Sequence, residues 1–274
     1  YCGQEGWREG PARHQHAMEG WHGWDAYAPF YDWENARTVG RRDIPFWRRQ
    51  VVACGGPVLE LGCGTGRVLL PMARTGEQVV GLDRSTNMLG LARRRLRRAR
   101  GTDSARLVRG DIRSLPFASD GHFSLVMAPY GVLQSLLRNQ DLRRTLVSVQ
   151  SVLRPGGTFA MELVPDVPQW GEYEHRVSHV GHRQGGSARI SLVESVRQDR
   201  SRQLTVFEQE FTERRGRCRT TQRFSLTFRT LSMRQMTGRL RRAGFTIERL
   251  EGDYVGGPWT AEAETWLVVA HRAR

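Results

Sequence analysis

The segment PVLELGCGTGR at residues 57–67 joins a short apolar run to three glycines, Gly62, Gly64 and Gly66. Glycine adopts backbone conformations that other residues avoid, and it lets a ligand approach main-chain atoms closely. A strand, a glycine-rich turn and a helix in this order form the ligand-binding unit of α/β proteins, in which the ligand lies beyond the carboxyl ends of the strands. The segment therefore predicts an α/β fold with a ligand held against residues 62–66.

Strand-like and helix-like segments alternate through the middle of the chain. Apolar runs predict strands at residues 58–61, 78–83, 106–111, 123–129 and 158–164, and helical spacing predicts helices at 66–76, 85–100 and 141–157. Ser85 is expected to cap the second helix, and Gly156 and Gly157 are expected to end the third. Strands that alternate with helices predict a parallel sheet covered on both faces.

The pattern changes between residues 172 and 229. Long segments of alternating polarity lie at 188–198, 202–215 and 223–230, with turns at 199–202 and 214–217. They predict an antiparallel insertion that acts as a lid or as a dimer surface. The α/β pattern then resumes with a helix at 232–245, where Ser232 and Gln235 predict a capping box and Gly244 the helix end, followed by strands at 245–254 and 265–272.

Two kinds of ligand compete for a glycine-rich turn after a strand. A dinucleotide site takes G-x-G-x-x-G, and its third glycine would fall at position 67, which is Arg67. The chain has E-x-G-x-G-x-G from Glu60 to Gly66 instead. This pattern resembles motif I of the class I S-adenosylmethionine-dependent methyltransferases, whose ligand carries a sulfonium, an amino-acid end and an adenosine but no phosphate.

The resemblance implies roles for two further acids. Asp83 ends the second expected strand, where the family has an acidic residue that accepts from both ribose hydroxyls; taken alone, it is equally an ordinary acid at a helix start. Asp111 follows the third strand, where the family has an Asp that accepts from the adenine amino group; taken alone, Gly-Asp signals only a turn. The residue after Asp111, Ile112, would then pack on the adenine ring.

The resemblance covers roughly residues 25–165 and is closest to the small-molecule type of the family. It implies S-adenosylmethionine as cofactor, held by Tyr31, Glu60, Gly62, Cys63, Gly64, Gly66, Asp83, Arg84, Met88, Asp111, Ile112 and Met127. The implied fold is α/β, with a seven-stranded, mostly parallel Rossmann-like sheet, helices on both faces and the antiparallel β insertion after the fifth strand. The expected parts are an N-terminal extension at 1–24, the cofactor-binding core at 25–171, the insertion at 172–229, and a closing helix with two strands at 230–274.

Two aromatic segments bear on the acceptor. The fourth expected strand ends in Met-Ala-Pro-Tyr at 127–130, whereas family members that methylate base amino groups or glutamine amides often have Asn, Asp or Ser before Pro-Pro-Tyr. That difference disfavours such acceptors, and Tyr130 either lines the acceptor pocket or only packs. Residues 26–47 resemble the leading helices that cover the cofactor in small-molecule members. Tyr31 is the first candidate for a cofactor contact and Tyr27 the second, and a plain aromatic contact with the core is the alternative.

The chemistry limits the catalytic candidates. Methyl transfer from a sulfonium is an in-line displacement in which positioning supplies most of the rate. An amine acceptor must also lose a proton, and a hydroxyl acceptor usually needs a base. The chain has no lysine, so His, Glu, Asp and Tyr remain. We take Tyr130 and Glu162 as catalytic candidates, with Asp166 nearby; a carboxylate there suits a cationic amine, unless it is simply solvated.

Histidines and cysteines give weaker signals. His175, His179 and His182 would share a face and could bind a metal on a helix, but their flanking residues predict strand or loop, so we expect no metal site. On a strand, the first two would face one way and His182 the other. The four cysteines form no C-x-x-C pair, which argues against a zinc site and a disulfide framework and fits a reducing cytoplasm.

The net charge of +14 invites a nucleic-acid interpretation. All 42 basic residues are Arg, however, and a GC-rich genome's codons would give this bias without any polyanion. We interpret the Arg run at 93–100 as a solvated helix end, where cations are favourable. No apolar run approaches the ~20 residues of a membrane span, and residues 1–24 have no apolar stretch of a secretory signal. Met18 is a candidate start, so residues 1–17 receive no function.

We therefore expect a cytoplasmic methyltransferase that moves a methyl group from S-adenosylmethionine to a nitrogen or oxygen of a small-molecule acceptor, with the insertion as a candidate homodimer surface. Two alternatives stay open. An RNA methyltransferase would have a continuous Arg groove leading to Tyr130. A non-catalytic S-adenosylmethionine-binding module would have its acceptor pocket filled by aromatic residues of the insertion, whereas an open, polar pocket favours catalysis.

Overall fold

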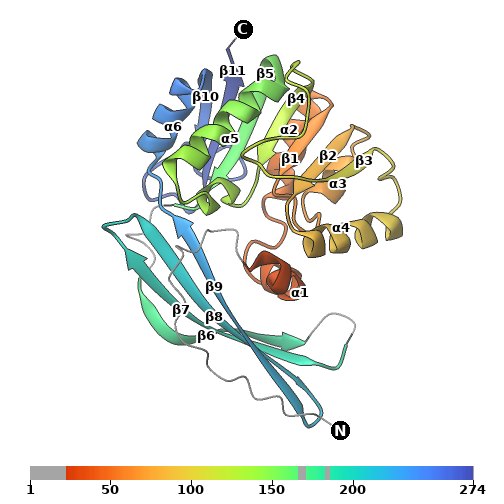
Figure 1. Ribbon diagram of the computed structural model, residues 1–274, viewed down its shortest axis with the longest axis vertical. Coiled ribbons are helices and arrows are strands. Elements are labelled where there is room, and N and C mark those ends of the chain that lie inside the picture. The colour runs from red at the N-terminus through yellow and green to blue at the C-terminus, as the bar shows by residue number, and fades with distance from the viewer. Residues whose placement is uncertain (1–22, 166–170, 183–185, 274) are drawn as a thin grey trace.

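The computed structural model describes residues 23–165, 171–182 and 186–273. It has a seven-stranded sheet and a four-stranded sheet, with helix α1 (Trp24–Asn35) between them (Figure 1). The predicted fold class is confirmed. Most of the N-terminal extension expected at 1–24 lies outside the described residues. Its last residue, Trp24, is the first residue of α1.

The seven-stranded sheet contains β1 (Val58–Leu61), β2 (Val79–Asp83), β3 (Ala105–Arg109), β4 (Phe123–Ala128), β5 (Leu153–Leu163), β10 (Phe245–Glu251) and β11 (Trp266–Arg272). Its order is β10-β11-β5-β4-β1-β2-β3. The pairs of β11 with β10 and with β5 are antiparallel, and the other neighbouring pairs are parallel. The chain moves outward from β1 to β3 and then restarts on the other side of β1 with β4. This reversal leaves a crevice at the carboxyl ends of β1 and β4, where α/β proteins bind ligands.

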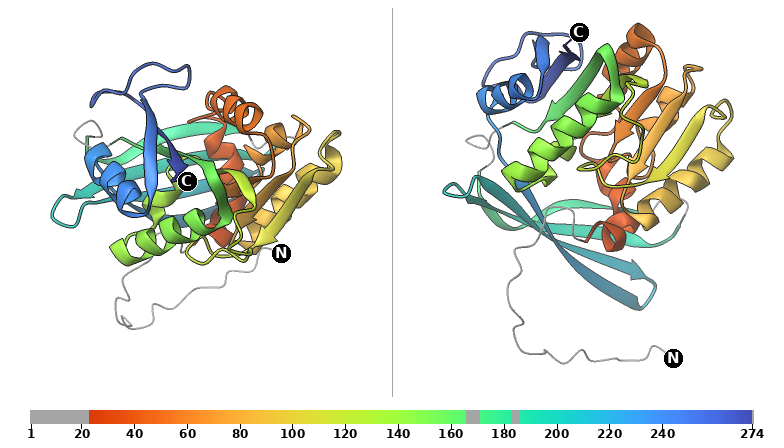
Figure 2. Two further views of the ribbon diagram at one scale, coloured as in Figure 1. Left: turned by 90° about the horizontal axis from the view of Figure 1, so that it is seen from above. Right: turned by 45° about the horizontal axis from the view of Figure 1, so that its top comes forward.

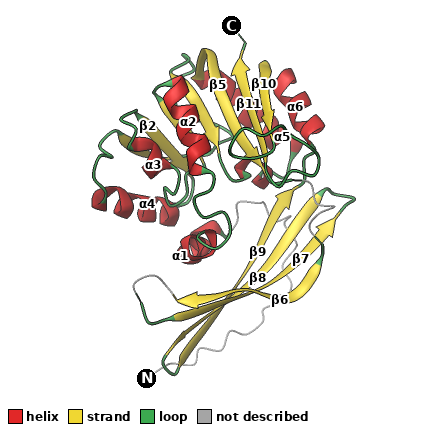
Figure 3. Cartoon of the chain, turned by 180° about the vertical axis from the view of Figure 1, so that it is seen from behind, coloured by secondary structure: helices red, strands yellow, loops and turns green. Residues whose placement is uncertain are grey.

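Helices cover both faces of this sheet. They are α2 (Ile44–Cys54), α3 (Leu69–Ala73), α4 (Thr86–Arg98), α5 (Asn139–Val152) and α6 (Met233–Arg242), with a short 3-10 helix η1 (Val132–Ser135) after β4. Side chains of a strand alternate between faces. On β1, Leu59 and Leu61 accordingly join the core under α5 and α6, while Val58 joins the core under α2 and α3. Figure 1 shows α5 and α6 on the near face, and Figure 3 shows α2 on the opposite one.

Two predicted helix boundaries were wrong. The third predicted helix ends at Val152 and not at the glycine pair, because Leu153 is already extended and pairs with Phe123 of β4. The helix predicted at 66–76 is limited to the five residues of α3. The other end signals are confirmed: Ser85 Oγ accepts from Met88 N, and Ser232 with Gln235 forms the capping box of α6.

The insertion forms a separate antiparallel sheet in the order β6-β7-β8-β9. Its strands are β6 (Tyr173–His182), β7 (Arg189–Asp199), β8 (Leu204–Arg215) and β9 (Cys218–Arg229). One face of it packs on α1, where the rings of Phe30 and Phe211 stack 4.5 Å apart and Tyr27 meets Phe224 edge-on. The right view of Figure 2 shows α1 between this sheet and the α/β body. The insertion therefore covers the crevice through α1.

Candidate active site

The glycine-rich turn after β1 leaves its main chain open. Gly62, Gly64 and Gly66 have φ angles of +61°, +52° and +77°, in the left-handed region that residues with a Cβ rarely adopt. A Cβ on Gly62 would lie 2.4 Å from Cγ2 of Val132, so no side chain fits there. A Cβ on Gly64 would lie 3.7 Å from Cε1 of Tyr31. The turn therefore presents bare main chain beneath α1.

Asp83, at the end of β2, holds this turn. Its Oδ2 accepts a hydrogen bond from Gly64 N at 2.9 Å, and its Oδ1 accepts from Ser85 N at 2.8 Å. Burial raises the pKa of the Asp83 carboxyl, although these main-chain N–H groups oppose the shift. The carboxylate also lines the cavity beside the turn, which is the place that the predicted ribose contact requires.

Asp111 and Ile112 follow β3 and line the same cavity. Arg113 holds Asp111 through its main-chain N, 2.9 Å from Oδ1, and through Nη2, 2.8 Å from Oδ2. Burial alone would raise the pKa of Asp111, but the hydrogen bonds and charge of Arg113 outweigh it and lower that pKa. The carboxylate is therefore ionised near neutral pH and can only accept hydrogen bonds, as the predicted adenine contact requires.

This first cavity has a volume of about 140 Å³ and lies at the carboxyl ends of β1, β2 and β3. Of the predicted cofactor-binding residues, it is lined by Tyr31, Glu60, Gly62, Cys63, Gly64, Asp83, Arg84, Met88, Asp111 and Ile112. Two others do not line it. Gly66 faces Ala92 of α4, and Met127 is fully buried in the core under α2 and α3.

Glu60 gives the first cavity an unpartnered buried acid. The residue is 3% exposed, and its Oε2 has no hydrogen-bond partner among the described residues. Burial raises the pKa of Glu60 to about 8, against the opposing charge of Arg67. Arg67 itself pairs with buried Asp43 at 2.6 Å. An acid without a partner beside open main chain fits a ligand with a cationic end, and S-adenosylmethionine carries both an ammonium and a sulfonium.

Helix α1 covers the first cavity and is fastened to the α/β body at both ends. Near its start, Asp25 Oδ1 accepts a hydrogen bond from Ser85 Oγ. Near its end, Asp32 accepts from Thr65 Oγ1 at 2.6 Å and pairs with Arg95 Nη2 at 2.7 Å. These contacts join α1 to the glycine-rich turn and to α4.

A second cavity of about 350 Å³ adjoins the first. It lies between α1, the ends of β4 and β5, the insertion, and the loop between β10 and β11. Trp24, Tyr31, Tyr130 and Phe228 line both cavities. The second cavity therefore meets the first directly at this aromatic junction.

Glu162, at the end of β5, is the buried acid of the second cavity, with 5% exposure. Its Oε2 accepts from Tyr130 N at 3.0 Å, and its Oε1 accepts from Tyr254 Oη at 2.8 Å. Burial raises the pKa of Glu162 to about 7, although the N–H of Tyr130 opposes the shift. Tyr130 has an unusual φ of +52°, and its ring lies at the junction of the cavities. The two catalytic candidates are therefore in direct contact.

Three more acids line the second cavity: Glu34, Glu194 and Glu264. Tyr27 Oη donates to Glu34 Oε2 at 2.6 Å, and Gln209 Nε2 donates to Glu194 Oε2 at 2.6 Å. Burial raises the pKa of Glu34 to about 7. Tyr27, the second candidate for a cofactor contact, lines this cavity and not the first one.

The remaining candidates are dispersed. His179 lines the second cavity, whereas His175 and His182 are exposed on β6, whose register is shifted by bulges. Within the described part of the chain, no group of three or more His, Cys, Asp or Glu residues could hold a metal ion. Asp166 lies outside the described residues. The Arg run at 93–100 is mostly exposed, but Arg95 forms the ion pair with α1 described above.

The sequence did not reveal several residues that line these cavities. Arg67 stands inside the recognised motif and could have been inferred from its position. Phe228 and Arg229 come from the last strand of the insertion, and Tyr254 from the loop between β10 and β11. No local pattern marks these three, because only the packing of distant segments brings them to the site.

Replacing Asp83 with Ala should weaken binding of S-adenosylmethionine about 10- to 100-fold. The change removes a charged acceptor from the cavity and leaves the N–H groups of Gly64 and Ser85 without it, and hydrogen bonds to charged groups contribute about 1.5–3 kcal/mol each. Calorimetric titration measures the effect. Asp199→Ala is the matched control, because Asp199 caps an exposed hairpin turn in a similar way. Unchanged affinity in Asp83→Ala would remove Asp83 from the binding site.

Comparisons with known proteins agree with this geometry. A family model described as a methyltransferase domain matches residues 58–157. The demethylmenaquinone methyltransferase of Lactiplantibacillus plantarum is 34% identical over 175 residues, which cover 58% of this chain and 70% of that protein.

Solved structures share the fold at lower identity. An S-adenosylmethionine-dependent methyltransferase from Clostridium acetobutylicum has a TM-score of 0.76 at 17% identity and covers 91% of this chain and 100% of that one. A sugar N-methyltransferase from Streptoalloteichus has a TM-score of 0.73 at 15% identity and covers 99% of this chain and 100% of that one. These two structures show the fold. The relative from Lactiplantibacillus, together with the motif and the cavity, shows the family. The chain belongs to the class I S-adenosylmethionine-dependent methyltransferases, enzymes that use S-adenosylmethionine as the methyl donor.

Proposed function

We propose that this enzyme methylates the nitrogen of a small-molecule amine. The observation that carries the proposal is the position of Glu162, a buried carboxylate with a pKa of about 7 next to the residues that separate the two cavities. Glu34, Glu194 and Glu264 also line this cavity. Buried acids favour a cationic ligand, and an amine is cationic before it reacts.

The residues of the second cavity suit this reaction. S-adenosylmethionine supplies an electrophilic methyl group when it is bound. Glu162 attracts the ammonium form of the acceptor and takes its proton, which leaves the nitrogen lone pair free to attack. Tyr254 Oη and Tyr130 N orient the carboxylate through one hydrogen bond to each oxygen. Tyr31 and Tyr130 exclude water at the junction, and positioning of the nitrogen supplies much of the rate.

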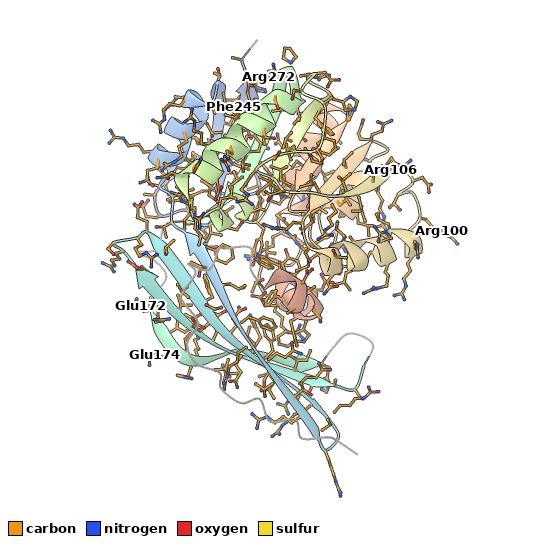
Figure 4. The ribbon with its side chains drawn as sticks, in the orientation of Figure 1. Arg100, Arg106, Glu172, Glu174, Phe245 and Arg272 are labelled. Atoms are coloured by element: carbon orange, nitrogen blue, oxygen red, sulfur yellow. The ribbon has the colours of Figure 1, made fainter. Side chains whose placement is uncertain are left out.

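Two observations support this acceptor class over the alternatives. The second cavity keeps a volume of about 350 Å³ and has glutamates in its lining beside its aromatic residues, which favours catalysis over a non-catalytic binding module. In Figure 4, Arg100 and Arg106 project from the outer edge of the α/β body, on the side away from Glu172 and Glu174 of the insertion, and neither lines a cavity that contains Tyr130. The similar fold of a sugar N-methyltransferase supports a nitrogen acceptor. No helix in the described ranges is long and apolar enough to cross a membrane.

A pH profile with a panel of acceptors tests the proposal. Small primary and secondary amines, matched alcohols and a short RNA are each incubated with labelled S-adenosylmethionine. We expect methylation of amines, with kcat falling as the pH drops below about 7, because Glu162 must be unprotonated to take the proton. Preferential methylation of the alcohols or of the RNA would overturn the amine assignment.

A further inference from the structure

We propose that Arg229 forms an oxyanion subsite in the second cavity, so that the acceptor amine also carries a carboxylate or a phosphate group. This inference rests on the proposed amine acceptor and adds a second recognition point to it. Arg229 is the last residue of β9, is 6% exposed and lines the second cavity.

Within the described ranges, the guanidinium of Arg229 donates only to uncharged acceptors. Its Nη1 donates to Leu136 O at 3.3 Å and its Nη2 donates to Asn139 Oδ1 at 2.7 Å. Its Nε is buried and has no hydrogen-bond partner in the described part of the chain. A buried cation normally has an anionic partner, because the loss of hydration is otherwise uncompensated.

A second guanidinium approaches the same acceptor. Arg239 Nη2 donates to Asn139 Oδ1 at 3.0 Å, so two cations share one amide oxygen. Burial and the charge of Arg239 lower the pKa of Arg229 to about 10. Burial and the charge of Arg242 likewise lower the pKa of Arg239. Positive charge is therefore concentrated here, and no described carboxylate forms an ion pair with either arginine.

Two partly buried arginines, Arg67 and Arg113, differ from Arg229. Arg67 forms two hydrogen bonds to the carboxylate of Asp43, at 2.6 and 2.7 Å. Arg113 pairs with Asp111 at 2.8 Å and with Asp141 at 3.3 Å. Among the described residues, no carboxylate forms an ion pair with Arg229. A ligand oxyanion would complete Arg229 in the way that Asp43 completes Arg67, because a guanidinium binds carboxylate and phosphate with the same fork geometry.

The subsite and Glu162 lie in one cavity and are joined by Gln134. Gln134 Nε2 donates to Arg229 O at 3.2 Å and to Val164 O at 3.1 Å, and Val164 N donates to Gln134 Oε1 at 2.8 Å. Val164 is two residues after Glu162 on the same chain segment. An acceptor with an amine at Glu162 and an oxyanion at Arg229 would therefore be held at two points, which fixes the nitrogen toward the first cavity.

The test measures anion binding directly. The enzyme saturated with S-adenosylhomocysteine is titrated with inorganic phosphate and, separately, with acetate, at constant ionic strength. We expect one of the two to bind to the wild type and to bind at least 10-fold more weakly to Arg229→Met. Arg202→Met, in the exposed hairpin between β7 and β8, is the control and should bind as the wild type does. Tighter phosphate binding would indicate a phosphorylated acceptor, and tighter acetate binding a carboxylated one.

Several outcomes would overturn the subsite. Anion binding that is equal in wild type and Arg229→Met, or absent in both, would do so. Arg229→Met should fold, since it removes an unbalanced buried charge. Arg229→Lys keeps the charge without the fork geometry and should bind the anion at intermediate strength. A Lys variant that binds the anion as tightly as wild type would also contradict the proposal. Binding of S-adenosylhomocysteine should be unchanged in both variants. Failure here, combined with Glu162-dependent methylation of simple amines, would reject the subsite alone; anion binding through Arg229 without amine methylation would reject the proposed function alone.

Discussion

The variant Glu162→Gln is expected to reduce kcat about 100-fold, at the lower end of the effect of general acid–base catalysis. Gln keeps the size of the side chain, and its carbonyl oxygen can still accept from Tyr130 N while its amide donates to Tyr254 Oη. It cannot take a proton or attract an ammonium. Steady-state kinetics with an amine acceptor measure the effect, and the fall of kcat below pH 7 should disappear with it.

Binding and stability separate this effect from damage to the fold. Glu162→Gln should bind S-adenosylmethionine as the wild type does, because Glu162 does not line the first cavity. The folded pKa of about 7 lies above the ordinary value of 4.5, so ionisation of Glu162 lowers the free energy of unfolding as the pH rises from 4.5 through 7. Gln does not ionise, so the variant avoids this decrease in the free energy of unfolding. At about 1.4 kcal/mol per pKa unit, it should be up to about 3 kcal/mol more stable than wild type at pH 8. A variant with full kcat would contradict the role of Glu162 as base.

Replacing Gly62 with Ala is expected to abolish measurable binding of S-adenosylmethionine and to destabilise the fold by about 2–5 kcal/mol. The new Cβ would lie 2.4 Å from Cγ2 of Val132, and φ at this residue is +61°. Overpacking costs about 1–3 kcal/mol and the left-handed backbone adds about 1–2 kcal/mol. Relief of the clash must move either the turn or η1, and both line the first cavity. Calorimetry and chemical denaturation measure the two effects.

Gly76→Ala is the matched control for Gly62→Ala. Gly76 also has a positive φ, of +91°, but nothing lies within 4 Å of a Cβ built on it. It should lose only the backbone contribution, about 1–2 kcal/mol, with unchanged cofactor binding. If Gly62→Ala behaves like Gly76→Ala, the close contact with Val132 is not what keeps the turn open.

The residues on the cofactor side of the site were predictable because each one is marked by a short local sequence pattern at the end of a strand. Each of its acids or glycines ends one strand, and the carboxyl ends of neighbouring parallel strands meet at one edge of the sheet. Gly62, Asp83 and Asp111 therefore line one cavity although 49 residues separate the first from the last. Met127 was placed less well because side chains of a strand alternate, and on β4 its side chain joins the core under α2 and α3.

The acceptor side depends on contacts that no periodicity encodes. Glu162 could be placed at a strand end, but the sequence shows neither the burial that raises its pKa nor the hydrogen bond from Tyr254 Oη that opposes the shift. The polarity of Arg229 gives no hint that it is enclosed, since exposed arginines surround it in the sequence. Its enclosure arises where the end of β9 meets Gln134, Leu136 and Asn139 of the α/β body.

The fastening of α1 has a kinetic consequence. Its inner side covers the donor cavity, and its outer side carries the aromatic face of the insertion. We expect release of the spent donor to open the contacts of Asp25 and Asp32 with the α/β body, and the insertion, which packs on the helix, to move with it. Exchange of the donor and exchange of the acceptor would then depend on the same movement of α1 and the insertion. The Asp32–Arg95 ion pair holds α1 in place, and salt weakens it. If product release limits turnover, turnover should therefore become faster as the ionic strength rises.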